Sequence, residues 1–225
     1  MADGQIATLT TAHAEVQPRV LLAALQHAAK HASQDFTRPH IAGALIEIRC
    51  GKLVLVSTDG HRLLKATINA ATDLAPDAVV TLLAAHSSII QLVSALKCHA
   101  KADPSMLAVV DATSSLLTLT TMGHGQTTCV QAVQEQFPPY AKVIPAHAIT
   151  GRADGDNDAG PSGCGMPHGV EASYLADAAM ACAAIAPGSK HKPVRIVVGG
   201  ALNPLSFYAE NEDATCLVVV MTVRI

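Results

Sequence analysis

The stretch that decides the fold is Ile41–Ile68, IAGALIEIRCGKLVLVSTDGHRLLKATI. Apolar and charged residues alternate over 46–49, as they do in a strand with one buried face. Two more runs rich in strand-forming residues follow, at 53–56 and 63–68. Between them lies Asp59-Gly60, a dipeptide that supplies the positive φ angles of a tight hairpin turn. The segment therefore predicts three antiparallel strands in succession.

The same order of elements is predicted three times along the chain. A strand and a helix precede the three strands of the first unit, and the second and third units repeat this order. The expected strands are 5–11, 46–49, 53–56 and 63–68, then 78–82, 106–111, 116–121 and 127–133, then 168–172, 194–198, 205–210 and 216–225, and the expected helices are 18–32, 89–96 and 174–186. Short strands joined by hairpins favour an α+β fold, with antiparallel sheets and helices on one face.

The chain length and one polar stretch set the expected domains. At roughly 150 residues per domain, 225 residues hold between one and two domains. Gly, Asp, Asn and Pro crowd into 151–161 with almost no apolar anchor, which indicates a linker. We expect a two-unit domain at 1–145, a linker at 146–165 and a half domain at 166–225.

The composition excludes several classes of protein. Hydrophobic residues make up 50% of the chain, which argues against disorder. Aromatic residues make up only 3%, and the net charge is −3, so neither base-stacking platforms nor a broad basic field is expected. The six cysteines form no C-x-x-C pair, and no secretory or membrane-spanning pattern is present, so we expect a cytoplasmic protein with reduced cysteines and no membrane association.

Three segments carry a resemblance to a known family. The spacing from Ile41-Ala42-Gly43 to Ser57-Thr58-Asp59-Gly60-His61-Arg62-Leu63 resembles the middle domain of the bacterial sliding clamp, the β subunit of DNA polymerase III. Gln136–Pro145 is similar to the segment leaving that domain, with Lys142 where arginine is usual. Val170–Leu175 and Val219–Ile225 are similar to the second half of the last domain, with Thr222 in place of a proline.

The resemblance implies a DNA-clamp-like fold and a hydrophobic pocket between the two lobes. In the family this pocket receives short peptides of DNA polymerases, the clamp loader and repair proteins. Carried over to this chain, the pocket residues are Ile41, Thr58, Gly60, Leu63, Pro138, Val143, Tyr174, Val219 and Met221, with His61, Arg62, Lys142 and Arg224 at the rim. Two plainer interpretations stay open: a simple hairpin with His61 and Arg62 solvated, and Val219 and Met221 as ordinary core residues of a strand.

The resemblance also implies a face that meets double-stranded DNA without sequence specificity. The basic residues on or next to the matching helices are Arg19, Lys30, Lys97, Lys101, Lys190 and Lys192. So few cations would give loose, salt-dependent contact with phosphates. The alternative is that they are ordinary solvated helix residues.

No catalytic or metal-binding motif is evident. His27 and His31 have the i, i+4 spacing that presents two imidazoles to one metal, but no third ligand is apparent. We expect a solvated helix face there, no metal, no cofactor and no enzymatic activity, with a small metal-dependent hydrolase as the rival hypothesis.

The sequence thus predicts an accessory factor of DNA replication that raises polymerase processivity. The family's first domain and the first half of its last domain find no match in the chain, so we do not expect the family's usual head-to-tail ring. A different homo-oligomer is compatible with the sequence. The alternative function is a non-encircling adaptor or decoy that binds partner peptides.

Overall fold

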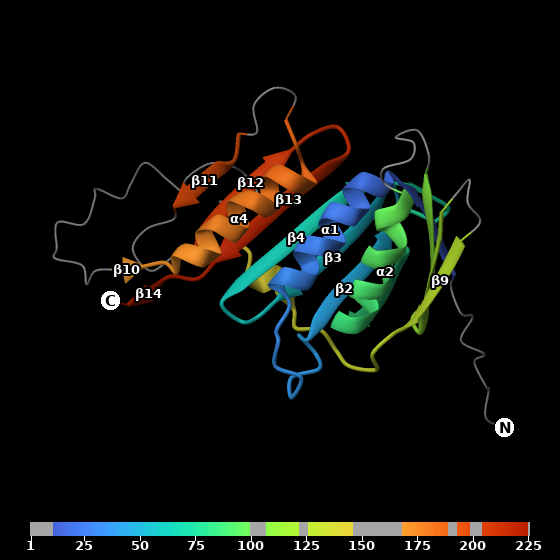
Figure 1. Cartoon of the computed structure of the whole chain (residues 1–225), viewed down its shortest axis with the longest axis horizontal. Helices are drawn as coiled ribbons and strands as arrows, with labels where there is room; N and C mark the ends of the chain where they lie inside the picture. The colour runs from blue at the N-terminus through green and yellow to red at the C-terminus, as the bar shows by residue number, and fades with distance from the viewer. Residues whose placement is uncertain are drawn as a thin grey trace.

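A computed structural model describes residues 11–99, 107–121, 126–145, 168–188, 193–198 and 204–224 of the chain. Within these residues the α+β class is confirmed, with three helices packed on antiparallel sheets (Figure 1). The first unit comprises β1 (Ala12–Val16), α1 (Pro18–His31), β2 (Gly43–Arg49), β3 (Lys52–Thr58), β4 (Arg62–Asn69) and the short β5 (Ala71–Thr72). The second comprises β6 (Val79–Ala85), α2 (His86–His99), β7 (Ala108–Ala112), β8 (Leu116–Thr121) and β9 (Gln126–Gln131), followed by the 3-10 turn η1 (Tyr140–Lys142). The third comprises β10 (His168–Gly169), α4 (Ala172–Ile185), β11 (Arg195–Val198), β12 (Leu205–Glu210), β13 (Ala214–Val220) and β14 (Val223–Arg224).

The first two units exchange their leading strands. The seven-stranded sheet has the order β11-β12-β13-β4-β3-β2-β6, and the five-stranded sheet has the order β5-β1-β7-β8-β9. Strand β1 of the first unit therefore pairs with β7 of the second, while β6 of the second pairs with β2 of the first. Each unit completes the sheet of the other, so the described residues of the first two units form one interlocked body.

Helix α1 lies between α2 and α4 on one face of the seven-stranded sheet (Figure 1). Pro18 opens α1, because its fixed φ suits the first helical position and its missing N–H would be unpaired there anyway. Leu21, Ala24, Leu25 and Ala28 follow at helical spacing and are buried. This stripe belongs to the main core cluster, which includes residues of both large sheets.

The third unit is joined to the first by strand pairing. Strand β13 pairs antiparallel with β4 over its whole length, from Ala214 opposite Ile68 to Val220 opposite Arg62. The opposite face of the sheet holds a second core cluster, over which the segment leaving β9 packs with Phe137. The division into domains at 1–145 and 166–225 stays a prediction, and the expected linker lies outside the described residues.

Three expected strands differ most from the structure. The strand expected at 168–172 is only the two-residue β10, because α4 already begins at Ala172. The first strand was expected at 5–11, but β1 begins only at Ala12, and its residues Ala12, Ala14 and Val16 are buried in alternation. Residues 5–10 lie outside the described part. The strand expected at 216–225 is two strands, β13 and β14, separated at 221–222.

Candidate functional site

The turn between β3 and β4 is held by its own side chains. Gly60 adopts a φ of 96°, a left-handed conformation that favours glycine. Asp59 Oδ1 accepts hydrogen bonds from the backbone N–H groups of His61 (2.9 Å) and Arg62 (3.0 Å). Thr58 Oγ1 donates to the carbonyl of Arg62 (2.7 Å) and accepts from Gly60 N–H (3.1 Å). The hairpin turn expected at Asp59-Gly60 is confirmed, with a fixed shape.

A cavity of about 220 Å³ lies beside this turn. Leu63 and Val219, which are direct partners across the β4–β13 pair, are buried, whereas Val143 and Met221 are exposed. The backbone N–H of Met221 donates to the carbonyl of His61 (2.8 Å), which holds the end of the third unit against the turn. The lining residues are all among those predicted for the pocket: Thr58, Gly60, His61, Arg62, Leu63, Val143, Val219 and Met221.

The other predicted pocket residues do not line this cavity. Tyr174 lies at its border, with its ring centroid 6.5 Å from that of His61 and 4.5 Å from Arg62 Cζ. Ile41 is buried in the loop before β2, and Lys142 is exposed in η1. The remaining two are Pro138, which lines a second cavity, and Arg224, whose side chain lies outside the described residues.

Arg62 is not solvated, as the simple-hairpin interpretation would require. Its side chain is only 10% exposed and donates to Asp59 Oδ2 (2.9 Å), Asp177 Oδ2 (2.6 Å) and the carbonyl of Lys30 (2.9 Å). Lys30 Nζ also pairs with Asp177 Oδ1 at 2.5 Å. Burial alone would raise the pKa of Asp177, but hydrogen bonds from Lys30 and Arg62 hold it below its ordinary value. The resulting network links β4, α1 and α4 next to the cavity.

The histidines of α1 also differ from the expected solvated face. His31 is fully buried, and its Nδ1 donates to the carbonyl of His27 at 2.8 Å. Burial lowers the pKa of His31 to about 4, so the ring is neutral at physiological pH. The described residues contain no group of three or more His, Cys, Asp or Glu side chains arranged to hold a metal.

The residues predicted to face DNA fall into two groups. Arg19 and Lys97 are exposed on α1 and α2, and Lys30 is half-exposed but paired with Asp177. The other three, Lys101, Lys190 and Lys192, lie outside the described residues. None of the helices in the described part is long and apolar enough to cross a membrane.

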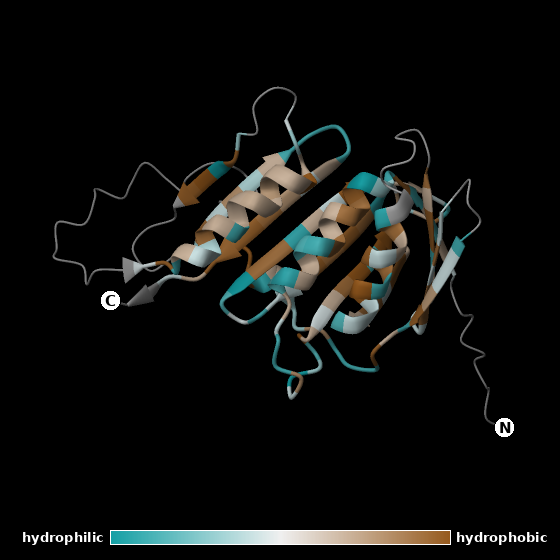
Figure 2. Cartoon of the chain, in the orientation of Figure 1, coloured by the Kyte–Doolittle hydropathy of each residue, from teal (hydrophilic) through white to brown (hydrophobic). Residues whose placement is uncertain are grey.

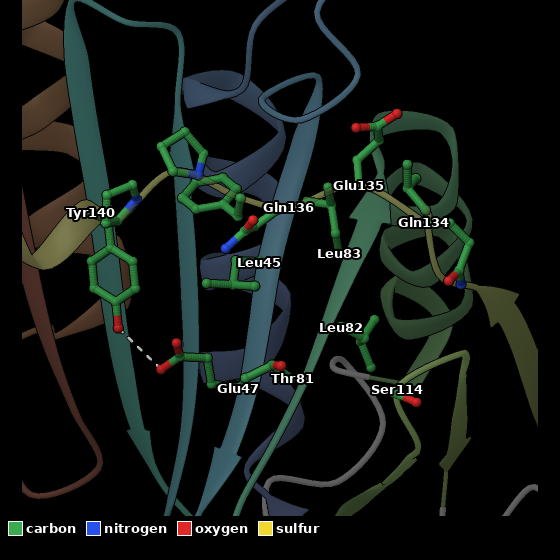
Figure 3. Close-up of a pocket in the computed structure, with 14 residues that line it drawn as sticks. Leu45, Glu47, Thr81, Leu82, Leu83, Ser114, Gln134, Glu135, Gln136 and Tyr140 are labelled. Carbon is green, nitrogen blue, oxygen red and sulfur yellow. Dashed lines mark hydrogen bonds between the residues drawn. The ribbon is translucent and has the colours of Figure 1, made fainter.

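A second, larger cavity of about 480 Å³ lies under the segment that follows β9 (Figure 3). Its buried polar group is Glu47, whose Oε2 accepts from Tyr140 Oη (3.1 Å) and Arg49 Nη2 (2.7 Å). Burial, reinforced by the Glu47 charge, raises the pKa of Tyr140 to about 12. The lining residues are Leu45, Glu47, Thr81, Leu82, Leu83, Ser114, Val133, Gln134, Glu135, Gln136, Phe137, Pro138, Pro139 and Tyr140.

The alternation of residues over 46–49 concealed this second site, because it places Glu47 on the polar face of a strand. A signal was present in the next strand: the unbroken apolar run 53–56 is typical of a strand buried on both faces. Phe137 and Tyr140 supply the cover on that second face.

Comparisons with known proteins agree with this architecture. No family model matches the chain, and no curated protein matches it. Among solved structures, the DNA polymerase sliding clamp of Pseudomonas aeruginosa aligns with a TM-score of 0.70 and 18% identity over 97% of this chain and 67% of its own. The β subunit of DNA polymerase III from Thermotoga maritima gives 0.68 and 15% over 100% and 70%, and the clamp of Bartonella birtlesii bound to griselimycin gives 0.65 and 17% over 100% and 68%.

At these identities the likeness concerns the fold, and the chain spans about two thirds of the length of the clamps it matches. The agreement extends over nearly all of the chain, including the third unit. The chain therefore has the fold of the bacterial sliding clamp, the β subunit of DNA polymerase III.

Proposed function

We propose that this chain is a sliding-clamp-like accessory factor of DNA replication that binds short peptides of polymerases, the clamp loader or repair proteins. The observation that carries the proposal is the 220 Å³ cavity, whose lining comes from the β3–β4 turn, the segment leaving the second unit and the end of the third unit. The role is binding and not catalysis, and such a factor acts in the cytoplasm.

The chemistry of the cavity suits an apolar anchor on a peptide. Leu63 and Val219 provide a dry floor, and the flexible thioether of Met221 adapts to the shape of a leucine or phenylalanine side chain. The absence of a side chain at Gly60 lets a peptide backbone approach the turn. A polymerase held in this way stays near the primer end, because tethering raises its effective concentration there.

The pocket is tested by peptide binding. A fluorescently labelled clamp-binding peptide should bind with micromolar affinity, and griselimycin, with which two sliding clamps have been solved, should compete for the site. Met221→Asp should abolish binding, because a carboxylate would be desolvated against Leu63 and Val219. The matched control is Ile90→Asp, which changes an equally exposed apolar residue on α2 and should bind as the wild type does. Unchanged binding by Met221→Asp would refute the assigned site.

A second candidate function is an adaptor or decoy that binds partner peptides without encircling DNA. It is favoured by the charge distribution, because the net charge is −3 and the Lys30 ammonium is already paired with Asp177. The two candidate functions are distinguished by measuring how much of the protein stays on nicked circular DNA before and after the DNA is linearised. Loss of protein upon linearisation supports encirclement, whereas no retention on either form supports the adaptor.

A further inference from the structure

We propose that the larger cavity, beneath the segment that follows β9, binds a small organic cation whose charged head is received by Glu47. The ligand class is a protonated amine on an apolar stem. The cavity volume of about 480 Å³ lies in the range of small-molecule sites in proteins. The cavity shares no lining residue with the 220 Å³ cavity beside the β3–β4 turn, so the inference does not rest on the proposed peptide pocket.

Glu47 is the residue that distinguishes this cavity. Its side chain is only 6% exposed, and it is the most deeply buried of the Asp, Glu, Lys and Arg residues in the described part of the chain. Figure 2 shows its surroundings, because the central strands of the seven-stranded sheet are mostly apolar in colour. A carboxylate in such a layer needs a donor or an opposite charge at each of its oxygens.

Only one of the two carboxylate oxygens of Glu47 is matched in this way. Tyr140 Oη, Arg49 Nε and Arg49 Nη2 all donate to Oε2, at 3.1, 3.0 and 2.7 Å. No described residue donates a hydrogen bond to Oε1, although Glu47 lines the cavity. Oε1 is therefore an open acceptor at the cavity wall. The group that suits it best is a charged N–H donor, because hydrogen bonds between ions are stronger than neutral ones.

The charges around the cavity favour a cation over an anion. Its described lining residues include two carboxylates, Glu47 and Glu135, and no Lys, Arg or His. Arg49 pairs with Oε2, but its side chain is 47% exposed, so water screens much of its charge. Lys65 lies 5.8 Å from the centroid of the Tyr140 ring and does not line the cavity. An anion would therefore meet carboxylates and no cationic side chain in this lining.

The cavity has a polar end and an apolar end. Glu47 and Thr81 are direct partners across the β2–β6 pair and lie side by side (Figure 3), so the Thr81 hydroxyl is a second acceptor for an ammonium group. Leu45 and Leu83 form the next pair on the same face and belong to the cluster that Phe137 covers. An apolar stem can thus pack against these leucines while the charged head reaches Oε1.

The probe for this site is 2-phenylethylamine, which carries an ammonium group on a phenylethyl stem. Titration calorimetry and NMR shifts of the backbone amides of β2 and β6 should report saturable binding with a Kd of about 1 mM or tighter. The neutral analogue 2-phenylethanol should bind at least about tenfold more weakly, because it lacks the charge-assisted hydrogen bond. The anion 3-phenylpropanoate should not bind.

Variants of Thr81 separate the effect of charge from that of shape. Thr81 is exposed, so both variants should keep the fold, which circular dichroism checks. Thr81→Lys places an ammonium group beside Glu47 across the strand pair and should weaken binding of the amine at least about tenfold. Thr81→Met has a side chain of similar girth without charge and should bind the amine more tightly than Thr81→Lys. Glu47→Gln removes the charge itself and should weaken binding as Thr81→Lys does.

A further control separates this site from the peptide pocket. Met221→Asp alters the other cavity only and should bind 2-phenylethylamine as the wild type does. Three results would each overturn the inference: no saturable binding of 2-phenylethylamine up to about 10 mM, equal affinity for 2-phenylethanol, or equal binding by Thr81→Lys and Thr81→Met. Glu47 would then be a structural partner of Arg49 and Tyr140 alone.

Discussion

Removal of the Arg62 side chain should loosen the attachment of the third unit. In the folded chain the guanidinium donates hydrogen bonds to the carboxylates of Asp59 and Asp177 and is largely shielded from solvent. Its Cζ atom lies 4.5 Å from the centroid of the Tyr174 ring. Arg62→Ala therefore removes the bridge between the β3–β4 turn and α4. It also leaves Asp177, itself 14% exposed, with Lys30 as its remaining ion-pair partner.

The magnitude follows from the burial of the pair. Loss of one partner of a buried ion pair costs about 3–5 kcal/mol, because the other charge is left unpaired. Lys30 still neutralises part of the Asp177 charge, so we expect the free energy of unfolding to fall by about 2–3 kcal/mol at pH 7. Burial would raise the pKa of Asp177, but its hydrogen bonds hold that pKa below the ordinary 3.8. The stabilisation from the Asp177 carboxylate is therefore complete above pH 3.8 and is lost as the pH falls through the pKa of Asp177 in the folded chain. The variant and the wild type should differ less in free energy of unfolding at such low pH.

Urea unfolding followed by circular dichroism measures this loss. The control is Arg38→Ala, because Arg38 forms a solvent-exposed pair with Asp35 at 3.3 Å. That variant should lose little stability, because solvent screens an exposed ion pair. If Arg62→Ala loses no more than Arg38→Ala, the network does not hold the third unit and the reasoning is wrong.

Three further changes test other parts of the fold. Lowering the pH from 6.5 to 4 should destabilise the wild type by up to about 3 kcal/mol, because burial lowers the pKa of His31 to about 4 and the unfolded chain takes up the proton first. In His31→Gln the midpoint of urea unfolding should depend less on pH over this range. A pH dependence equal to that of the wild type would contradict the assignment. Gly43→Ala should lower the free energy of unfolding by about 2–3 kcal/mol, since the new Cβ would lie 2.1 Å from the carbonyl oxygen of Ala84. An unaltered melting temperature would show that β2 and β6 can move apart at this position without loss of stability. Tyr140→Phe should lose about 1–2 kcal/mol by removing a donor to the buried Glu47 carboxylate, and a stability equal to the wild type would mean that water replaces the hydroxyl.

Local features of the fold were predictable from short-range chemistry. The strands at 116–121 and 205–210 are observed with the expected bounds, because alternation of side chains is a property of the strand itself. The turn at Asp59-Gly60 was likewise encoded locally, by a residue that tolerates positive φ and an acid that accepts two backbone hydrogen bonds.

Features that depend on docking between units were not predictable in this way. The spacing of Leu21, Leu25 and Ala28 predicts a single buried stripe on α1, but this helix lies between α2 and α4 and is covered on both flanks. His31 and Arg62 are buried by that arrangement, which joins residues far apart in the sequence. The pairing of β13 with β4 is also long-range, and only the family resemblance brought Met221 and His61 to the same candidate site.

The candidate pocket and the docking of the third unit are thermodynamically linked. Leu63 contributes one half of the cavity floor from β4 and Val219 contributes the other from β13, so the cavity exists only while these two strands are paired. A ligand that binds only the docked form stabilises it by RT ln(1 + [L]/Kd). At a peptide concentration 100 times Kd this amounts to about 2.7 kcal/mol, comparable with the loss expected for Arg62→Ala. A saturating peptide should therefore restore much of the stability of Arg62→Ala. The peptide should bind this variant with a weaker apparent affinity than the wild type, because binding must also drive the docking of the third unit.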